Sequence, residues 1–360
     1  MEPSVPARRR QRERVYARSG LDLRRGIAHK TRVTTEWQPQ ECDLSVLGAA
    51  QADLHARAES VARDRFGRQV FVRAVVEVSN YCRENCHYCG MRRENRSLDR
   101  YRARFEELAE LLIHHRPTSV TDVNIQAGED PVAVRTVVIP LVKALKQQTS
   151  LGISVCLGTL PLDLTADLQS AGASVYIIKF ELADASLYER FEAPGTLSER
   201  LGFIRHIASK GWQVSSGFIA GLPGQTLAAT VQNLHLASHL PLMGCSVSPF
   251  IPGEETPLAA EQQTSVELSL NCMAALRLMR PDWIIPAVSA LNLAEPSDGY
   301  RRGLRTGANL CTINLTPENL RSDYLLYRRE RIIMSEERIL TAIAAEGLSI
   351  SEQSIADYLR

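Results

Sequence analysis

Three cysteines, Cys82, Cys86 and Cys89, stand within eight residues of one another. Thiolates are ligands of soft metals, and the C-x3-C-x2-C spacing supplies three of them from one short loop. Three thiolates suit three corners of a cubane iron–sulfur cluster and leave the fourth iron open to a small chelating ligand. A zinc site needs a fourth ligand, and His87 lies between two of the cysteines, where joint tetrahedral ligation is awkward. The spacing therefore favours a cluster, with zinc or a structural loop as the alternative.

The remaining cysteines are scattered singly, and their number and spacing do not suggest a disulfide framework. We expect each of them to be a small hydrophobic residue of the core. Cys156 and Cys245 fall in predicted strands and Cys272 in a predicted helix, so a second cluster built from these three is an alternative. The isolated cysteines are Cys42, Cys156, Cys245, Cys272 and Cys311.

The composition is that of a globular protein: 42 Lys and Arg residues oppose 41 Asp and Glu residues, and 44% of the residues are hydrophobic. The net charge of +1 argues against a general polyanion binder. No apolar run reaches the roughly 18 residues of a membrane span, and Met1–Arg32 lacks the apolar core of a signal peptide. We therefore expect a cytoplasmic protein without a membrane partner. Ala7–Arg32, with ten Lys or Arg residues, is predicted to be a surface arm, and contact with nucleic acid is the less favoured alternative.

After a predicted helix over Asp43–Phe66, short apolar runs alternate with helical patterns. This alternation predicts parallel strands with right-handed helical crossovers, and eight of them close most economically into an α/β fold of the (βα)8 TIM-barrel type. An open doubly wound sheet is the alternative. We expect a basic arm and helical extension over residues 1–66, the barrel over 67–327 and a C-terminal helical tail over 328–360. The predicted strands are Val70–Val78, Ser119–Ile125, Ile153–Leu157, Ser174–Phe180, Gln213–Ile219, Gly244–Phe250, Trp283–Ala287 and Asn309–Asn314. The predicted helices are Arg104–His115, Pro131–Gln148, Leu164–Ala171, Leu197–Lys210, Leu227–Leu240, Gln263–Met279, Tyr300–Thr306 and Glu336–Glu346.

The chemically unusual residues fall at the carboxyl ends of the predicted strands, where barrels of this kind carry their active sites. The cysteine loop follows the first strand directly. On that strand Arg73 and Glu77 share one face by period-two alternation, and two charges in an apolar strand must pair or serve a polar ligand. A buried Arg73–Glu77 ion pair and an anion-binding role for Arg73 are both open. After the seventh predicted strand, Ser289 and Asn292 are candidate substrate-contacting residues.

These features resemble the radical S-adenosylmethionine (SAM) superfamily, in which an aromatic residue, here Tyr88, precedes the last cysteine of the motif. The resemblance is most specific to the subgroup of the FeFe-hydrogenase maturase HydE and the methylornithine synthase PylB, which is related to biotin synthase. It covers about Phe66–Tyr327, with several motifs in the same order. They are Val78–Asn95, Gln126–Pro131, Phe180–Glu181 with Arg200, Gly217–Thr226, Pro249–Pro252 with Thr256–Leu258, Gly307–Asn309 with Asn314–Pro317, and Tyr324–Tyr327.

The resemblance implies a 4Fe–4S cluster on the three cysteines and S-adenosyl-L-methionine chelated at its open iron. A reductase such as flavodoxin or ferredoxin would supply one electron, and a 5′-deoxyadenosyl radical would attack a small-molecule substrate inside the barrel. Gly128 would let the backbone approach the ligand closely, and Arg200 offers a fork for the SAM carboxylate. A mutual Glu181–Arg200 ion pair is the alternative. The residues implied in cofactor binding are Tyr88, Gly128, Glu129, Glu181, Arg200, Gly217, Ile219, Gly221, Tyr324 and Tyr327.

The mouth of the predicted barrel departs from the maturase pattern. Lys179 and Leu182 replace the Arg and Thr that usually flank the matching glutamate, and Thr159 stands where the maturase commonly has an acid. We therefore expect rearrangement or fragmentation of an amino-acid-like substrate, with a HydE-like metallocofactor maturase as the alternative. A sulfur-inserting synthase and a non-catalytic metal-bearing binding protein are minor alternatives.

Overall fold

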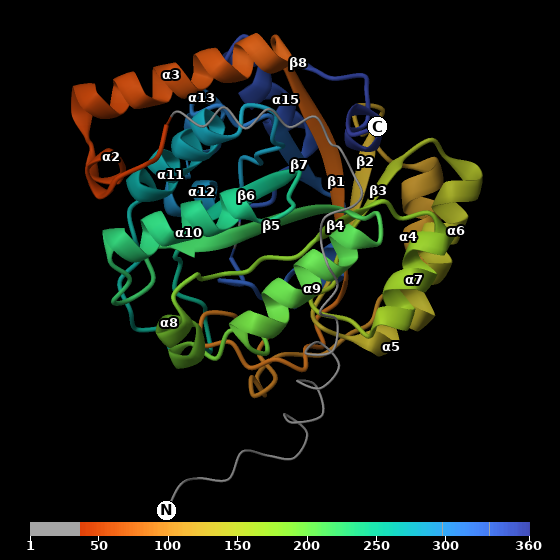
Figure 1. The fold of residues 1–360 in the computed structure, drawn as a ribbon. Helices are drawn as coiled ribbons and strands as arrows, with labels where there is room; N and C mark the ends of the chain where they lie inside the picture. Colours follow the sequence, from red (N-terminus) through yellow and green to blue (C-terminus); the bar gives the residue numbers. More distant parts are fainter. Residues whose placement is uncertain (1–36, 297, 331) are drawn as a thin grey trace, which may run out of the picture.

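The computed structural model describes residues 37–296, 298–330 and 332–360, so the predicted basic arm lies outside the described residues. Within them, seven parallel strands form a curled sheet in the order β6-β5-β4-β3-β2-β1-β7, and a short eighth strand pairs with β1 (Figure 1). The strands are β1 (Gln69–Ser79), β2 (Asp122–Ala127), β3 (Gly152–Cys156), β4 (Val175–Ile177), β5 (Gln213–Ala220), β6 (Gly244–Pro249), β7 (Leu310–Asn314) and β8 (Ser349–Ile350).

The seventh predicted strand, Trp283–Ala287, is not a regular strand. Ile284 forms an isolated parallel bridge with Gly244 of β6, and Pro286 forms another with Leu310 of β7. Pro286 has no N–H to donate, so a continuous ladder is interrupted here. The segment still stands between the two edge strands of the sheet. The predicted α/β barrel is therefore confirmed, with one irregular position in its ring of strands.

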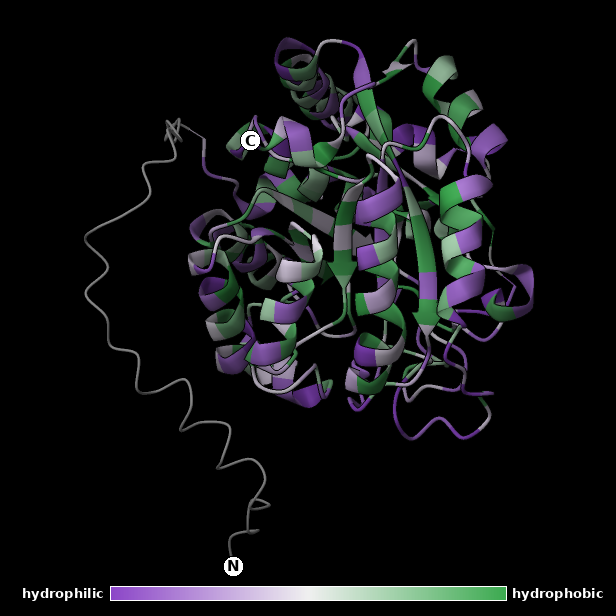
Figure 2. Ribbon diagram, turned by 90° about the vertical axis from the view of Figure 1, so that its right-hand side faces the viewer, coloured by the Kyte–Doolittle hydropathy of each residue, from purple (hydrophilic) through white to green (hydrophobic). Residues whose placement is uncertain are grey.

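Helices cover the outside of the curled sheet, and their polar faces point away from it (Figure 2). The apolar residues between sheet and helices form the main hydrophobic core. None of the helices in the described part of the chain is long and apolar enough to cross a membrane. The helices that follow the predicted pattern are α4 (Phe105–His114), α5 (Pro131–Ala133), the π-helical turn η1 (Val134–Val138), α6 (Ile139–Gln148), α7 (Leu162–Ala171), α9 (Leu197–Ser209), α10 (Leu227–His239), α11 (Val266–Met279), α13 (Gly299–Arg305) and α15 (Glu336–Ala345).

Four short helices were not predicted, because four to six residues are too few to show a helical period. They lie in loops or near the C-terminus, and one of them, α12, contributes residues to the wall of the cavity described below. They are α8 (Ala185–Arg190), α12 (Ser289–Ala294), α14 (Glu318–Arg321) and α16 (Ile355–Tyr358).

The single helix predicted over Asp43–Phe66 is instead two helices, α2 (Glu41–Ser45) and α3 (Gly48–Phe66). Asn271 of α11 holds the turn between them, because its side-chain amide donates to the carbonyl oxygens of Leu44 and Val46 (2.9 and 3.0 Å). These bonds satisfy acceptors that the end of a helix leaves free. Helix α3 then packs on α11 through an apolar cluster of Leu54, Ala58 and Ala274.

The C-terminal tail contributes to the barrel as well as to its surroundings. Strand β8 pairs with β1 at Gln69 and Val70, and α16 follows it. Asp122, the first residue of β2, accepts the backbone N–H of Ile355 with both carboxylate oxygens (3.1 and 3.0 Å). Because these contacts lie at the amino-terminal ends of β1 and β2, the tail closes the end of the barrel opposite the cysteine loop.

Candidate active site

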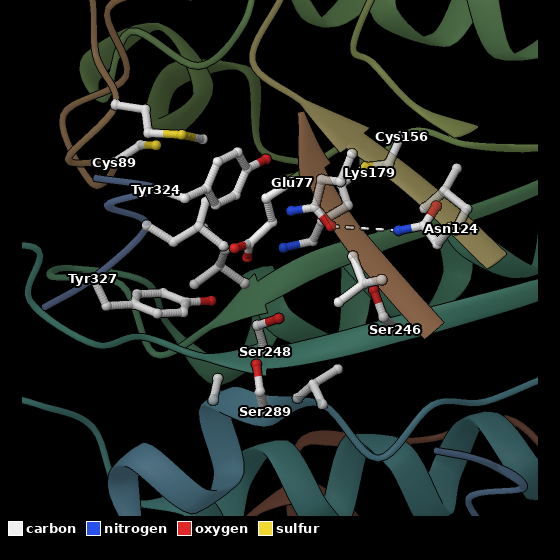
Figure 3. Close-up of a pocket in the computed structure, with 18 of the residues that line it drawn as sticks. Glu77, Cys89, Asn124, Cys156, Lys179, Ser246, Ser248, Ser289, Tyr324 and Tyr327 are labelled. Carbon is white, nitrogen blue, oxygen red and sulfur yellow. Dashed lines mark hydrogen bonds between the residues drawn. The ribbon is translucent and has the colours of Figure 1, made fainter. Parts of the chain in front are cut away.

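A cavity of about 360 Å³ opens at the carboxyl ends of the strands. Its wall is built from strand ends, the cysteine loop, the start of α12 and the segment after α14 (Figure 3). Parallel strands end at the same rim of a barrel, so residues far apart in the sequence converge here. The predicted site residues in its wall are Arg73, Glu77, Cys82, Cys86, Tyr88, Cys89, Gly128, Glu129, Glu181, Arg200, Ile219, Ser289, Tyr324 and Tyr327.

The cysteine loop contributes all three of its thiols to this wall. Cys86 is buried, whereas Cys82 and Cys89 are partly exposed. Burial raises the pKa of Cys82 to about 11 and that of Cys89 to about 12. The loop has no regular secondary structure, and the guanidinium of Arg100 holds its shape by donating to its carbonyl groups. The acceptors are the backbone oxygens of Asn80, Met91, Arg92 and Asn95.

The imidazole of His87, the residue considered for a zinc site, is engaged by Glu192, with 3.4 Å between Nε2 and Oε1. Among the described residues, no three His, Cys, Asp or Glu side chains converge closely enough to hold one metal ion. A single zinc ion needs all its ligand atoms at about 2.0–2.3 Å from one point, whereas the irons of a cluster each bind a cysteine of their own. No site for a single zinc ion is therefore found among the described residues.

Gly128 follows β2 and lies against the start of the cysteine loop. A Cβ atom at this position would lie 2.3 Å from the carbonyl oxygen of Tyr81 and 2.9 Å from Cβ of Cys82. Only glycine allows two backbone segments to approach so closely. The backbone N–H of Glu129 then donates to Sγ of Cys82 (3.4 Å). The close approach that we expected toward a ligand is thus made to the cysteine loop, which β2 supports.

Glu129 and Arg200 form a buried ion pair on the cavity wall, with 3.2 Å between Oε1 and Nη2 and side chains 6% and 3% exposed. Thr159 joins the two: its backbone N–H donates to Glu129 (2.9 Å) and its hydroxyl accepts from Arg200 (3.0 Å). Arg83 of the cysteine loop also donates to Glu129 (3.0 Å). The Glu181–Arg200 pair considered from the sequence is therefore wrong, because Glu129 takes its place.

Glu181 has a left-handed backbone conformation (φ +64°), which is uncommon for a residue other than glycine. Its N–H donates to the Gly217 carbonyl (3.1 Å) and its carbonyl accepts from the N–H of Ile219 (3.0 Å), so β5 holds the strained residue in place. Its carboxylate lies 3.2 Å from Nζ of Lys179. Strained backbone conformations of this kind are common at functional sites.

Gly217 and Gly221, two glycines expected to bind the cofactor, stand behind the cavity wall rather than in it. A Cβ atom on Gly217 would lie 2.1 Å from Oγ of Ser246, so this glycine lets the Ser246 side chain lie close against β5. Gly221 turns the chain after β5 with φ +85°, and its N–H donates to the side chain of Gln225 (2.6 Å). Of this motif, Ile219 is the predicted residue that reaches the cavity.

Asn292, predicted to contact substrate, does not line the cavity. Its side chain accepts the N–H of Tyr300 (2.7 Å) and donates to Sδ of Met334 (3.1 Å). It therefore joins α12 to α13 and to the segment before α15. Ser289, one helical turn earlier in α12, does line the cavity, where Figure 3 shows its hydroxyl next to that of Ser248.

Both charged residues predicted on β1 line the cavity. Four residues of extended strand separate their Cα atoms by about 13 Å, so they share a face without meeting. The Nε of Arg73 donates to the hydroxyl of Thr312 (3.1 Å), and no carboxylate of the described residues forms an ion pair with this guanidinium. Glu77 lies beside Tyr324, and Tyr324 and Tyr327 project into the cavity (Figure 3).

Several cavity residues were missed as site residues, although the sequence carries a signal for them. Each is a polar side chain at every second position in or directly after the carboxyl half of an apolar strand, and such a position faces the barrel interior. These residues are Asn124, Gln126, Cys156, Lys179, Ser246, Ser248, Thr312 and Asn314. Lys179, which differs from the maturase pattern, is also part of the cavity wall.

The isolated cysteines do not assemble a second cluster site. Cys156 lines the cavity, whereas Cys245 and Cys272 lie in the main hydrophobic core. Cys311 is also buried, as expected, but Cys42 is exposed on α2 and is not the core residue we predicted.

Comparison with known proteins gives consistent results. The model of the radical SAM superfamily matches residues 76–237. The FeFe-hydrogenase maturase subunit HydE of Thermotoga maritima is 33% identical over 270 residues, which are 75% of this chain and 77% of that protein. The 3-methylornithine synthase of Methanosarcina barkeri is 28% identical over 280 residues, 77% of this chain and 78% of its own. The crystal structure of methylornithine synthase, PylB, matches the fold with a TM-score of 0.78 at 24% identity, covering 91% of this chain and 98% of that one.

Proposed function

This chain belongs to the radical SAM superfamily of enzymes, and from that premise we propose that Cys82, Cys86 and Cys89 hold a 4Fe–4S cluster at which S-adenosylmethionine is reductively cleaved. The observation that carries the proposal is convergence: the three thiols line the same cavity as the Glu129–Arg200 pair and Glu181. A purely structural loop does not require its thiols to face the same cavity as these buried charged residues.

The cavity wall fits a polar ligand beside the cysteines. Two of its buried polar atoms, Nε of Arg200 and the hydroxyl of Tyr88, have no hydrogen-bond partner among the described residues. A buried polar atom without a partner costs about 1–3 kcal/mol, and the amino-acid and ribose groups of SAM carry the donors and acceptors that would satisfy both. This supports SAM binding next to the cluster loop.

When bound, the cluster and SAM supply a carbon-centred 5′-deoxyadenosyl radical. The residues of the chain position and shield this chemistry. Arg200, fixed by Glu129 and Thr159, offers its free N–H to a carboxylate, and Glu181 offers an acceptor for an ammonium or hydroxyl group. Ile219 and Phe250 line the same wall and keep water and mobile hydrogen donors away from a reactive carbon.

We infer that the substrate is a small amino-acid-like molecule that is rearranged or fragmented. The wall carries charges of both signs, because Arg73 and Lys179 line it together with Glu77 and Glu181. A zwitterion matches such a wall better than a neutral or singly charged molecule does. The electron for SAM cleavage would come from a low-potential reductase of the flavodoxin or ferredoxin class.

A second candidate is a metallocofactor maturase like HydE, favoured by the 33% identity over 75% of the chain. The two functions differ in what stimulates SAM cleavage. An amino-acid substrate should raise deoxyadenosine formation by the isolated enzyme, whereas a maturase should need the iron complex or hydrogenase that it serves.

The test is anaerobic reconstitution with iron and sulfide, reduction with dithionite, addition of SAM and quantification of 5′-deoxyadenosine. We expect about four irons per chain and deoxyadenosine in the wild type, and loss of both in Cys86→Ala. Cys42→Ala is the matched control, because Cys42 is exposed on α2, away from the cavity, and it should keep iron and activity. A wild type that takes up zinc instead of iron, or never cleaves SAM, would refute the proposal.

A further inference from the structure

We propose that the outer face of the cysteine loop is the docking surface for an acidic one-electron carrier protein, which supplies the electron for SAM cleavage. This inference rests on the proposed function, because it assigns a partner to the same site. The carrier is oxidised by one electron, which goes to the cluster, and no atom passes between the two proteins. The surface, which we name the loop-face patch, consists of Tyr81, Arg102 and Val132 with Arg93 and Arg96 at its rim.

Two apolar side chains of the patch are exposed. Among the described residues, three large hydrophobic side chains are exposed, and they are Leu47, Tyr81 and Val132. Tyr81 is 38% and Val132 51% exposed, and neither of them lines the cavity. A single exposed apolar side chain is ordinary in a folded protein. Tyr81 and Val132, however, are joined at one place on the surface.

Asp130 holds the centre of the patch together. This buried carboxylate accepts from Nε and Nη2 of Arg102 (2.6 and 3.0 Å) and from the backbone N–H of Val132 (3.1 Å). The guanidinium of Arg102 in turn lies over the ring of Tyr81, 4.0 Å from its centroid. Tyr81, Arg102 and Val132 therefore lie together in fixed orientations. Tyrosine and arginine are also the residue types that contribute most to binding energy at protein interfaces.

The patch lies directly outside the cysteine loop. Tyr81 and Cys82 are consecutive, so their Cα atoms are about 3.8 Å apart. The thiol of Cys82 lines the cavity, whereas the ring of Tyr81 is exposed outside it. The segment between β1 and α4 forms the lower edge of the molecule in Figure 1, next to α5. A protein that contacts Tyr81 therefore approaches the cluster loop without entering the cavity.

The charge of this segment suits an acidic partner. Residues 81–104 hold seven arginines and three acidic residues, in a chain whose net charge is +1. Arg93 and Arg96 are exposed, and Arg93 donates to the carbonyl oxygen of Arg83 near the start of the cysteine loop (3.1 Å). Exposed charges act over roughly 8–10 Å at moderate salt and speed the association of an oppositely charged protein. Electron-transfer complexes use small interfaces, so a patch of a few residues is sufficient.

A nucleic acid is the other kind of polyanion that a basic surface binds, but this patch favours a protein. Glu94 and Asp99 are exposed on the same segment and would repel a continuous phosphate backbone. Arg102 already covers one face of the Tyr81 ring, on which a base would stack. An acidic protein, unlike a polynucleotide, can leave gaps in its charge opposite these two carboxylates.

The experiment uses an acidic flavodoxin as the probe and the full chain as its partner. Binding to the chain without a cluster is measured by biolayer interferometry, and we expect it to weaken about tenfold or more when the salt is raised from about 20 mM to about 500 mM. SAM cleavage by the reconstituted enzyme is then driven either by flavodoxin, kept reduced by NADPH and flavodoxin reductase, or by dithionite. Dithionite is a small ion that needs no docking surface.

Two variants test the rim and the centre separately. Arg93→Glu/Arg96→Glu should weaken flavodoxin binding and raise the KM for flavodoxin by about tenfold or more at low salt. Val132→Glu should do so by about three- to tenfold, because it places a like charge and a polar group at the contact. Both variants should form as much 5′-deoxyadenosine with dithionite as the wild type does.

The chain offers a matched control for each variant on α3 and the turn before it, at the opposite edge of the molecule (Figure 1). Arg57→Glu/Arg65→Glu changes the net charge equally at two exposed arginines of α3, and Leu47→Glu makes the same kind of change at an exposed apolar residue. Both controls should bind flavodoxin and accept its electrons like the wild type.

Four results would overturn the docking surface. They are no binding of flavodoxin to the wild type at low salt, equal effects of the patch variants and their controls, an equal loss of deoxyadenosine with dithionite, and tighter binding of polyuridylate than of flavodoxin to the patch. The first result concerns a chain without a cluster. It is therefore distinct from a failure of the proposed function, in which the wild type does not cleave SAM even with dithionite.

Discussion

The two ends of the same cavity, the mouth beside the cysteine loop and the floor around Arg73 in the first half of β1, differ in how their cations are paired. At the mouth, Arg200 and Lys179 each have a carboxylate at 3.2 Å, and the Glu129–Arg200 pair is further tied by Thr159. At the floor, Arg73 donates to the hydroxyl of Thr312, and no carboxylate of the described residues forms an ion pair with it, although Asp122 lines the same small cavity. Ion pairs pre-organise a site for a ligand of fixed shape, whereas an unpaired cation leaves the counter-charge to the ligand.

A buried arginine elsewhere in the fold shows that the contrast does not depend on burial alone. Arg277 of α11 is fully buried, and no carboxylate of the described residues forms an ion pair with it, but its guanidinium donates to four oxygen atoms. With four of its five N–H groups hydrogen-bonded, its charge is spread over oxygen dipoles and it holds the loops around it. The acceptors are the backbone oxygens of Gly307, Pro281 and Trp283 and the side-chain oxygen of Asn309. Arg73 differs because only one direction of its fork is used.

The largest effect on stability should come from removing the ion pair at the mouth of the cavity. Glu129→Ala removes the partner of a buried Arg200 and should lower the free energy of unfolding by about 3–5 kcal/mol, because it leaves a buried charge uncompensated. Glu129→Gln should cost less, since its amide oxygen can still accept from Thr159. At the floor, Thr312→Val should cost only about 0.5–1.5 kcal/mol, as no ion pair is broken. Urea denaturation measures all three.

An exposed ion pair serves as the control for this series. Glu59 and Arg63 pair on the surface of α3, with side chains 34% and 39% exposed. Glu59→Ala should therefore cost less than about 1 kcal/mol. If Glu129→Ala were no more destabilising than Glu59→Ala, the mouth would not depend on its charge pairing, and the contrast with the floor would lose its meaning.

The sequence predicts where the site lies better than it predicts how its members pair. The cysteine loop, the barrel and the strand-end placement follow from spacing and alternation, which are local properties. The partner of Arg200 depends on how two loops after different strands approach each other, so Glu129 could not be distinguished from Glu181. The same limit separates Ser289 from Asn292, since one turn of a short helix decides which of them faces the cavity.

The sequence patterns also fail to predict the irregular elements, for a related reason. Trp283–Ala287 has the composition of a strand, but Pro286 interrupts its ladder and only two bridges form. Strand β8 has two residues and α16 has four, too few for a period to appear. The left-handed backbone of Glu181 is imposed by β5 through two hydrogen bonds and has no signature in the glutamate itself.

A smaller effect on stability should distinguish the backbone strain of Glu181 from the charge of its side chain. Glu181→Gly and Glu181→Ala both remove the carboxylate that faces Lys179, but only glycine relieves the left-handed backbone (φ +64°). The glycine variant should therefore be about 1 kcal/mol more stable than the alanine variant, by urea denaturation. Both should weaken SAM binding to the reconstituted enzyme by about tenfold or more, as measured by calorimetry.

Glu255 supplies the matched control for strain, because it has φ +56° and lies outside the cavity wall. Glu255→Gly and Glu255→Ala should show the same difference in stability while SAM binding stays unchanged. Equal stability of the two Glu181 variants would mean that β5 does not strain this residue. Unchanged SAM binding in both would remove Glu181 from the cosubstrate site.

The smallest effect concerns Asp130, which lies directly behind the mouth and accepts from both Nε and Nη2 of Arg102 (2.6 and 3.0 Å) and from Ser79 (2.8 Å). Burial alone would raise the pKa of Asp130, but these hydrogen bonds outweigh it and hold the pKa below its ordinary value. A carboxylate with a lowered folded pKa contributes stability above its unfolded pKa of about 3.9, and this contribution is lost as the pH falls through the folded value.

Asp130→Asn should therefore cost about 1 kcal/mol at pH 6, a modest value because Arg102 is one-third exposed. In urea denaturation the difference from the wild type should shrink toward pH 3. A difference that is equal at pH 6 and pH 3 would assign the effect to the Ser79 and backbone hydrogen bonds instead, and would confine the charge pairing of the mouth to the cavity wall.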